Sequence, residues 1–65
     1  MESLGGYLEM PVEIDFDEVV RETKLAWCVR IARIEVWLPK AITDLDKVTQ
    51  VVTMPEWLAA DKGLI

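Results

Sequence analysis

The sequence predicts a small α+β fold, an antiparallel sheet or partly closed barrel of about four short strands followed by one short C-terminal helix. Three observations predict it. Apolar and polar residues alternate with a period of two through most of residues 12–54. No stretch between these segments is long enough for the crossover helix that parallel strands require. Only residues 54–62 change to a helical pattern.

Length and composition indicate one domain. The chain has 65 residues, of which 52% are hydrophobic and 29% are charged, which is the usage of a folded protein rather than a disordered one. We expect a single small domain over residues 1–65, with 1–10 as a candidate flexible segment. A core in a chain this short contributes only about 3–5 kcal/mol, so a binding partner would add to its stability.

Most of the strand candidates come from the alternation in residues 12–38. In the first, Val12–Asp17, apolar residues alternate with acids, and Glu18–Thr23 is a second short candidate with β-branched residues. The clearest strand is Leu25–Ile31, whose alternate side chains include Trp27 on the expected core face. A tight turn at Ala32–Arg33 lacks the usual Gly or Asn, and Ile34–Leu38 returns after it.

The rest of the chain completes the sheet and adds the helix. Proline at position 39 ends the strand before it, because it has no N–H for the ladder. Residues 40–46 form a turn-like linker, and Val48–Met54 is a further strand. The helix over 54–62 begins at a capping-box spacing, Thr53 to Glu56, and Gly63 ends it. The side chains expected to pack back onto the sheet are Trp57, Leu58 and Leu64.

Negative charge is concentrated at the start of the chain. Residues 1–18 hold six of the twelve acids and no base, a charge of −6, whereas residues 19–65 hold six acids and seven bases, a charge of +1. On the predicted strand the acids project to one side at intervals of about 7 Å. We interpret this acidic strand face as a candidate surface for a protein partner with a basic surface. The alternative is a solvated face kept charged against edge-to-edge aggregation. The candidate acidic residues are Glu9, Glu13, Asp15, Asp17 and Glu18.

Trp37 is the candidate hydrophobic anchor. If Val36 and Leu38 face the core, its ring points to the opposite face of the sheet. A large exposed aromatic ring is typical of a surface that something covers. The C-terminal helix, a second copy of the chain in a homodimer, and a foreign partner all remain open.

The composition excludes most chemistry. The chain has no histidine, and its one cysteine, Cys28, has no catalytic partner. Paired carboxylates on a solvated face lack the apolar pocket that raises a catalytic pKa. We therefore expect no enzyme activity, no metal and no cofactor, and we interpret Asp44 and Asp46 as turn residues. We expect no membrane span, because no apolar run approaches about 20 residues, and a cytoplasmic location, because a lone cysteine suits a reducing compartment.

Nucleic-acid binding is the alternative from another class. Aromatic residues on a small barrel can stack single-stranded bases above a basic groove. The basic candidates are Arg21, Lys24, Arg30 and Arg33, beside Trp27 and Trp37. The net charge of −5 disfavours this hypothesis.

Several segments resemble a known group of proteins. They are RETKLAWCVRI, EVWLPKAI and PEWLAADKGLI, with an acidic turn and a Val/Thr strand before the last. This pattern is similar to that of small uncharacterised proteins encoded by bacteriophages and other mobile elements. It covers roughly residues 20–65. The chain departs from it at Ala41, where serine is usual, and at Ala32–Arg33, where Asp-Gly is frequent. The resemblance implies a mobile-element origin and no particular activity.

These observations lead to one main functional hypothesis. The chain is a small acidic binding module of phage type that docks on a host nucleic-acid-binding protein. Anti-defence inhibitors, anti-CRISPR proteins among them, are one class with this size and charge. A small barrel that binds single-stranded nucleic acid and a self-associating structural protein are the alternatives.

Overall fold

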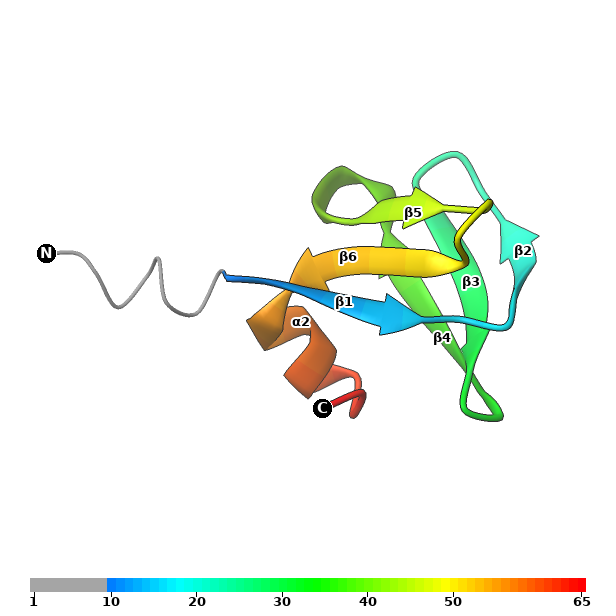
Figure 1. Ribbon diagram of the computed structural model, residues 1–65. Helices are drawn as coiled ribbons and strands as arrows, with labels where there is room; N and C mark the ends of the chain where they lie inside the picture. Colours follow the sequence, from blue (N-terminus) through cyan, green and yellow to red (C-terminus); the bar gives the residue numbers. More distant parts are fainter. Residues whose placement is uncertain (1–9) are drawn as a thin grey trace, which may run out of the picture.

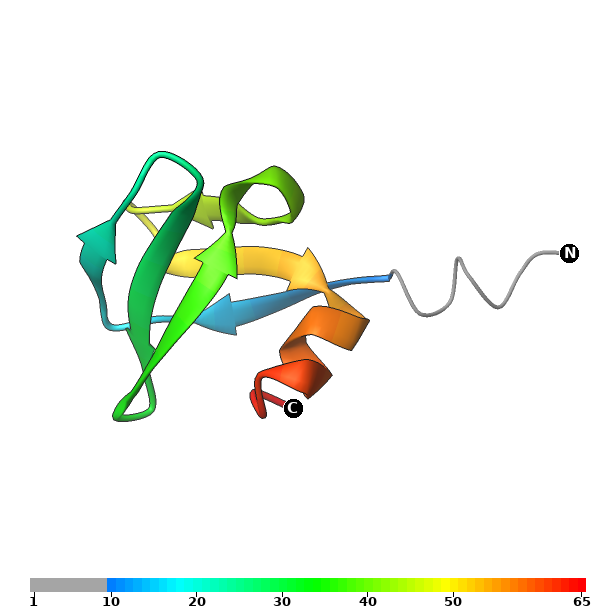
Figure 2. The same cartoon turned by 180° about the vertical axis from the view of Figure 1, so that it is seen from behind.

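Two three-stranded antiparallel sheets pack against each other around one hydrophobic core (Figure 1). The structure, a computed structural model, describes residues 10–65. Sheet A has the order β1-β6-β5, and sheet B has the order β2-β3-β4. The view from behind brings sheet B to the front, with the short helix α2 below it at one end (Figure 2). The small antiparallel α+β fold is thus present, as two sheets rather than a closed barrel.

Sheet A is built around β6 (Val51–Pro55), which pairs with β1 (Pro11–Asp15) on one side and β5 (Asp44–Asp46) on the other. Alternation buries one face of each strand. Val52 and Met54 of β6 are almost fully buried, and the partly buried apolar residues of the two outer strands pack against the same core. The acids of β1 and β5 consequently lie on the other face.

Sheet B is a meander of β2 (Glu18–Glu22), β3 (Ala26–Ile31) and β4 (Ile34–Pro39). Its core face carries Val29 and Leu38, both with no exposed surface. The β3–β4 turn is the predicted pair Ala32–Arg33, with φ angles of 49° and 75°. Both residues are therefore left-handed, as a two-residue hairpin loop of this kind requires. The packed strands impose this turn on residues that do not favour it.

The two sheets are joined where β1 passes into β2. Phe16 enters the core, with 5% of its surface exposed. Its N–H donates to the carbonyl of Gln50 at 3.0 Å, and the N–H of Asp17 donates to the carbonyl of Arg30 at 2.7 Å. The chain thus leaves sheet A and enters sheet B within two residues.

Helix α2 (Glu56–Asp61) covers one end of the core with Leu58 and Ala59. Gly63 ends it with a φ of 76°. The N–H of Leu64 donates to Ala59 at 2.8 Å and that of Gly63 to Ala60 at 3.1 Å, which is the Schellman arrangement. No helix in residues 10–65 is long and apolar enough to cross a membrane.

Several predicted elements need correction. The described chain has six strands rather than about four. The strand that lies in none of the predicted segments is β5, because the linker 40–46 contains a 3₁₀ turn, η1 (Lys40–Ile42), followed by this strand. The strand predicted from Val48 begins at Val51, since residues 47–50 form the β5–β6 turn. Leu25 lies before β3 and is exposed. The flexible segment predicted for 1–10 lies outside the described residues except for its last member.

The helix also differs from its prediction at its start. Pro55 is the N-cap residue, and no side chain caps the helix. The capping box is wrong because Thr53 belongs to β6, where it pairs with neighbours on both sides. Trp57 is 44% exposed and does not pack back on the sheet as expected. A six-residue helix has one narrow buried face, and Leu58 and Ala59 occupy it.

Candidate functional site

The outer face of sheet A gathers carboxylates from two strands that are far apart in the sequence. Strand β1 supplies two of them and β5 supplies two more, on either side of β6. Cross-strand partners lie on the same face of a sheet, about 5 Å apart. The acidic face, as we name these four carboxylates, forms two rows across β6: Glu13–Thr53–Asp44 and Asp15–Val51–Asp46.

The same local pattern builds both sides of this face. Ile14 separates the acids of β1 and Leu45 separates those of β5, and both apolar side chains pack against the core. Burial of the central residue turns its two neighbours outward, because successive side chains point to opposite faces. An acid–apolar–acid triplet on each edge of β6 is therefore enough to make the face.

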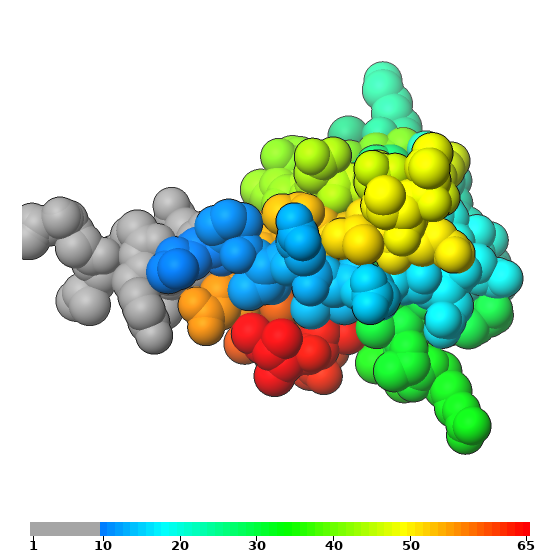
Figure 3. All heavy atoms as spheres, in the orientation of Figure 1, coloured from blue at the N-terminus to red at the C-terminus, as the bar shows by residue number. Residues whose placement is uncertain are grey.

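Three of these four carboxylates, Glu13, Asp44 and Asp46, line a shallow hollow of about 320 Å³. Its floor is the middle strand, and it ends at the β5–β6 turn, where Thr49 contributes to the lining. Asp46 holds that turn, since its Oδ1 accepts the N–H groups of Val48 at 2.9 Å and Thr49 at 3.2 Å. Figure 3 turns this side of the molecule toward the reader, with β1 in blue beside the yellow β5–β6 turn.

No basic residue balances the acidic face within sheet A. The three strands of the sheet contain four acids and neither lysine nor arginine. Within residues 10–65 the ion pairs fall elsewhere, and none includes a carboxylate of the acidic face. The face is thus a concentration of uncompensated negative charge.

Sheet B, in contrast, pairs its charges. Nη1 of Arg30 lies 2.8 Å from Oε2 of Glu18, and its Nη2 lies 3.2 Å from Oε2 of Glu35. Hydrogen bonds to Glu35 and then Glu18 raise the pKa of Arg30. Across the sheet, Nζ of Lys40 is 2.6 Å from Oε2 of Glu22, and this hydrogen bond lowers the pKa of that carboxyl. The acids of sheet B therefore carry local counter-charges that those of sheet A lack.

The structure divides the predicted acidic residues among several places. Glu13 and Asp15 lie together on β1, as the alternation predicts. Asp17 lies beyond the end of that strand, in the link to β2. Glu18 lies on sheet B, ion-paired to Arg30, and so does not extend the face. Glu9 lies outside the described residues.

Trp37 lies on the other side of the molecule. Val36 and Leu38 are buried in the core, and the ring between them is 43% exposed on the outer face of sheet B. Its cross-strand partner is Cys28, which is free and buried although it is not part of the core between the sheets. The tryptophan and the acidic face thus belong to two separate surfaces.

The basic and aromatic residues do not form one stacking groove. Arg30 is engaged by two glutamates. Trp27 packs against the core, and its indole N–H donates to the hydroxyl of Thr43 at 3.1 Å. The ammonium of Lys40 lies 5.1 Å from the centre of that ring. Of the residues predicted for nucleic-acid binding, Arg30 and Trp27 are thus engaged within the fold, and Trp27 and Trp37 lie on opposite faces of sheet B.

Sequence reasoning missed Asp44 and Asp46, which it interpreted as turn residues. The signal was present, because the triplet at 44–46 repeats the acid–apolar–acid pattern of 13–15. Within residues 10–65, no group of three or more possible ligands is placed to hold a metal ion. The chemistry that the acidic face offers is therefore electrostatic attraction and hydrogen-bond acceptance.

No family model, curated protein or solved structure matches this chain. The resemblance to phage and mobile-element proteins therefore stays a prediction.

Proposed function

We propose that this chain is a small acidic binding module that docks on a basic surface of another protein through the acidic face of sheet A. The observation that carries the proposal is the absence of any base on three strands that hold four acids. Like charges placed this close oppose folding. A face kept only for solvation can be built from uncharged polar residues or from mixed charges, as sheet B is.

The charge favours a partner that is itself strongly positive. Proteins that bind nucleic acids carry such surfaces, because they neutralise phosphates with lysine and arginine. A rigid face of carboxylates would occupy a phosphate-binding groove and steer its own association at a high rate. Inhibition of a host nucleic-acid-binding protein, as in anti-defence proteins, is the form of this function that we favour.

A variant of the acidic face tests the proposal directly. Glu13→Gln with Asp44→Asn removes one carboxylate from each side of β6, and Glu56→Gln with Asp61→Asn makes the same change of charge on α2. Tagged forms of all three proteins would capture partners from bacterial lysate at 50 mM and 500 mM salt, with mass-spectrometric identification. We expect proteins held by the wild type and the α2 variant to be lost from the acidic-face variant and at high salt. The same capture by all three proteins would contradict the proposal.

Self-association is a second candidate, favoured by the position of Trp37. Strand β4 is the last strand of sheet B, so one of its edges has no strand partner among residues 10–65. A second copy could pair along this edge and cover the exposed ring. Sedimentation over a range of concentrations measures this, and a monomer at every concentration excludes it.

A further inference from the structure

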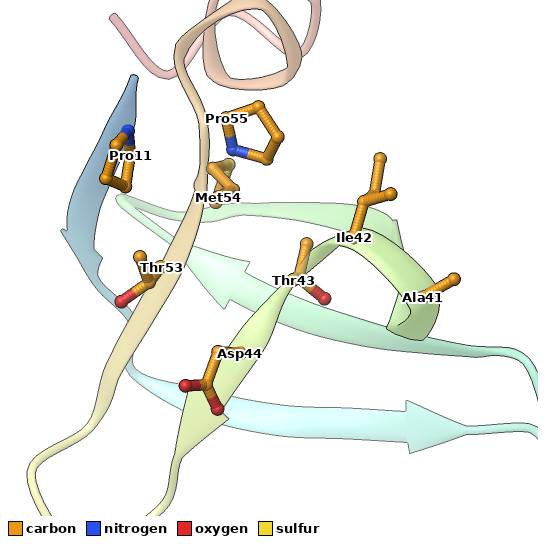
Figure 4. A pocket seen from close by; sticks show the side chains of 8 residues that line it. All are labelled: Pro11, Ala41, Ile42, Thr43, Asp44, Thr53, Met54 and Pro55. Carbon is orange, nitrogen blue, oxygen red and sulfur yellow. The ribbon is translucent and has the colours of Figure 1, made fainter. Parts of the chain in front are cut away.

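A second hollow, lined by five apolar residues, two threonines and Asp44, adjoins the acidic face. It has a volume of about 330 Å³ and lies where β6 ends and η1 leads into β5 (Figure 4). Two prolines flank one side, Ile42 and Ala41 of η1 flank the other, and Asp44 stands at the end nearest the acids. Pro11 and Pro55 are cross-strand partners, so they continue the two acidic rows by one further row.

The two hollows form one continuous surface. Both are lined by Asp44 and Thr53. Ile42 is 39% exposed at the apolar end, which is a large aliphatic surface for a side chain outside the core. The outer face of sheet A is therefore apolar at one end and acidic over the next two rows, at a spacing of about 7 Å per row.

We propose that this surface binds an extended segment of the partner protein that carries one apolar side chain followed by two basic ones. The inference rests on the function proposed above and specifies the partner's chemistry. In an extended segment, side chains of one face recur every second residue, which matches the row spacing of the sheet. An apolar first residue fits between the prolines and Ile42, and bases at the third and fifth residues meet the acidic rows.

The negative charge of the surface favours a basic protein segment over a nucleic acid. Four carboxylates without a base in sheet A repel nucleic acid and attract lysine or arginine. The prolines and Ile42 in the second hollow add an apolar contact that salt does not screen. A segment with one apolar and two basic side chains gains binding free energy at both ends of the surface, whereas a purely basic segment gains it only at the acidic end.

Synthetic peptides test the two ends separately. The probe is acetyl-Ser-Leu-Ser-Arg-Ser-Arg-Ser-amide, compared with one peptide in which serine replaces leucine and one in which glutamine replaces both arginines. Binding to the full chain is followed by amide chemical shifts at 20 mM salt. We expect the leucine replacement to weaken binding about tenfold, from the apolar area lost. The glutamine replacement should weaken it by at least as much, and 500 mM salt should have the same effect.

Two variants locate the apolar contact. Ile42→Ser should weaken binding of the leucine peptide about tenfold and leave the affinity for the serine peptide unchanged. Ile34→Ser, at a similarly exposed isoleucine on sheet B, is the matched control and should change neither. Amide spectra establish that both variants fold.

The outcomes separate this inference from the proposed function. If the leucine and serine peptides bind equally while binding still depends on arginine and salt, the apolar subsite is wrong and the acidic module stands. If arginine contributes nothing, both are wrong. If the same amides shift with protein concentration alone, a second copy of the chain occupies the surface, and the proposed partner is wrong.

Discussion

Replacing Asp44 by asparagine should stabilise the protein at low ionic strength. The acid lies across Thr53 from Glu13 and diagonally from Asp15, and within residues 10–65 its carboxylate takes part in no ion pair or hydrogen bond. Two strand spacings put Glu13 about 10 Å away, and the diagonal puts Asp15 at about 12 Å. By Coulomb's law each repels Asp44 by roughly 0.3–0.4 kcal/mol in unscreened water, and by more near a protein surface.

Asp46 adds little to this difference, because it is as near in the unfolded chain as in the strand. The folded state should therefore gain about 0.5–1 kcal/mol at 10 mM salt when Asp44 becomes neutral, and less than half of that at 0.15 M. For a domain of 65 residues the gain raises Tm by about 4–7 °C. Thermal unfolding followed by circular dichroism at both salt concentrations measures it.

The control is Glu35→Gln, which makes the same change of charge on sheet B. Because Glu35 is paired to Arg30 at 3.2 Å, its loss should lower Tm at low salt. A Tm for Asp44→Asn that is unchanged or lower at 10 mM, or equally raised at 10 mM and 0.5 M, would refute the electrostatic reasoning. Opposite signs for the two variants would show that charge on the acidic face opposes folding.

Three further predictions concern the rest of the fold. Arg33→Gly should raise the free energy of unfolding by about 1 kcal/mol in a denaturant titration, because φ is 75° there. Trp37→Ala should speed the reaction of Cys28 with a thiol reagent by at least about tenfold, since the ring is its cross-strand neighbour. Lys40→Gln should destabilise the protein at pH 7 and progressively less in acid. The ammonium lowers the pKa of Glu22 below 4.5, so the stability it supplies is complete above about pH 4.5 and is lost as the pH falls through the lower folded-state pKa.

Matched variants control each of these. Lys24→Gly removes the same charge at an exposed residue without a positive φ and should not stabilise. Trp57→Ala removes an exposed tryptophan from α2 and should leave thiol reactivity unchanged. Lys24→Gln should not alter the acid limb of the stability curve. If a variant and its control change stability, its pH dependence or thiol reactivity equally, the effect does not come from the local contact named for that variant.

The sequence predicted the strands whose signal is local. Alternation over 26–31 and 34–39 buries one face of each strand, and the two-residue turn between them fixes the pairing of Ile31 with Ile34. The turn formed without Gly or Asn because burial of Val29 and Leu38 depends on that register. Packing there outweighs turn propensity.

What the sequence did not reveal depends on contacts distant in the chain. Strand β5 has three residues, which is too short for a periodic signal, and it exists because β6 pairs with it. Thr53 has the spacing of a helix cap, yet the same pairing takes it into the sheet. The two acids of residues 13–15 were therefore predictable from the sequence. The contribution of Asp44 and Asp46 to the same face became visible only in the folded structure.

The arrangement makes binding and folding separable. In both acidic triplets the central residue, Ile14 or Leu45, packs against the core, whereas the flanking acids are exposed and the core does not need them. Glutamine at Glu13 and asparagine at the three aspartates would keep the alternation and remove the repulsion, and asparagine at Asp46 would keep the side-chain oxygen that accepts from the β5–β6 turn. A neutral face that is more stable and no longer binds would therefore assign the charge to recognition. If the variant with a neutral face is more stable and still binds, the charge is explained by protection of the sheet against aggregation.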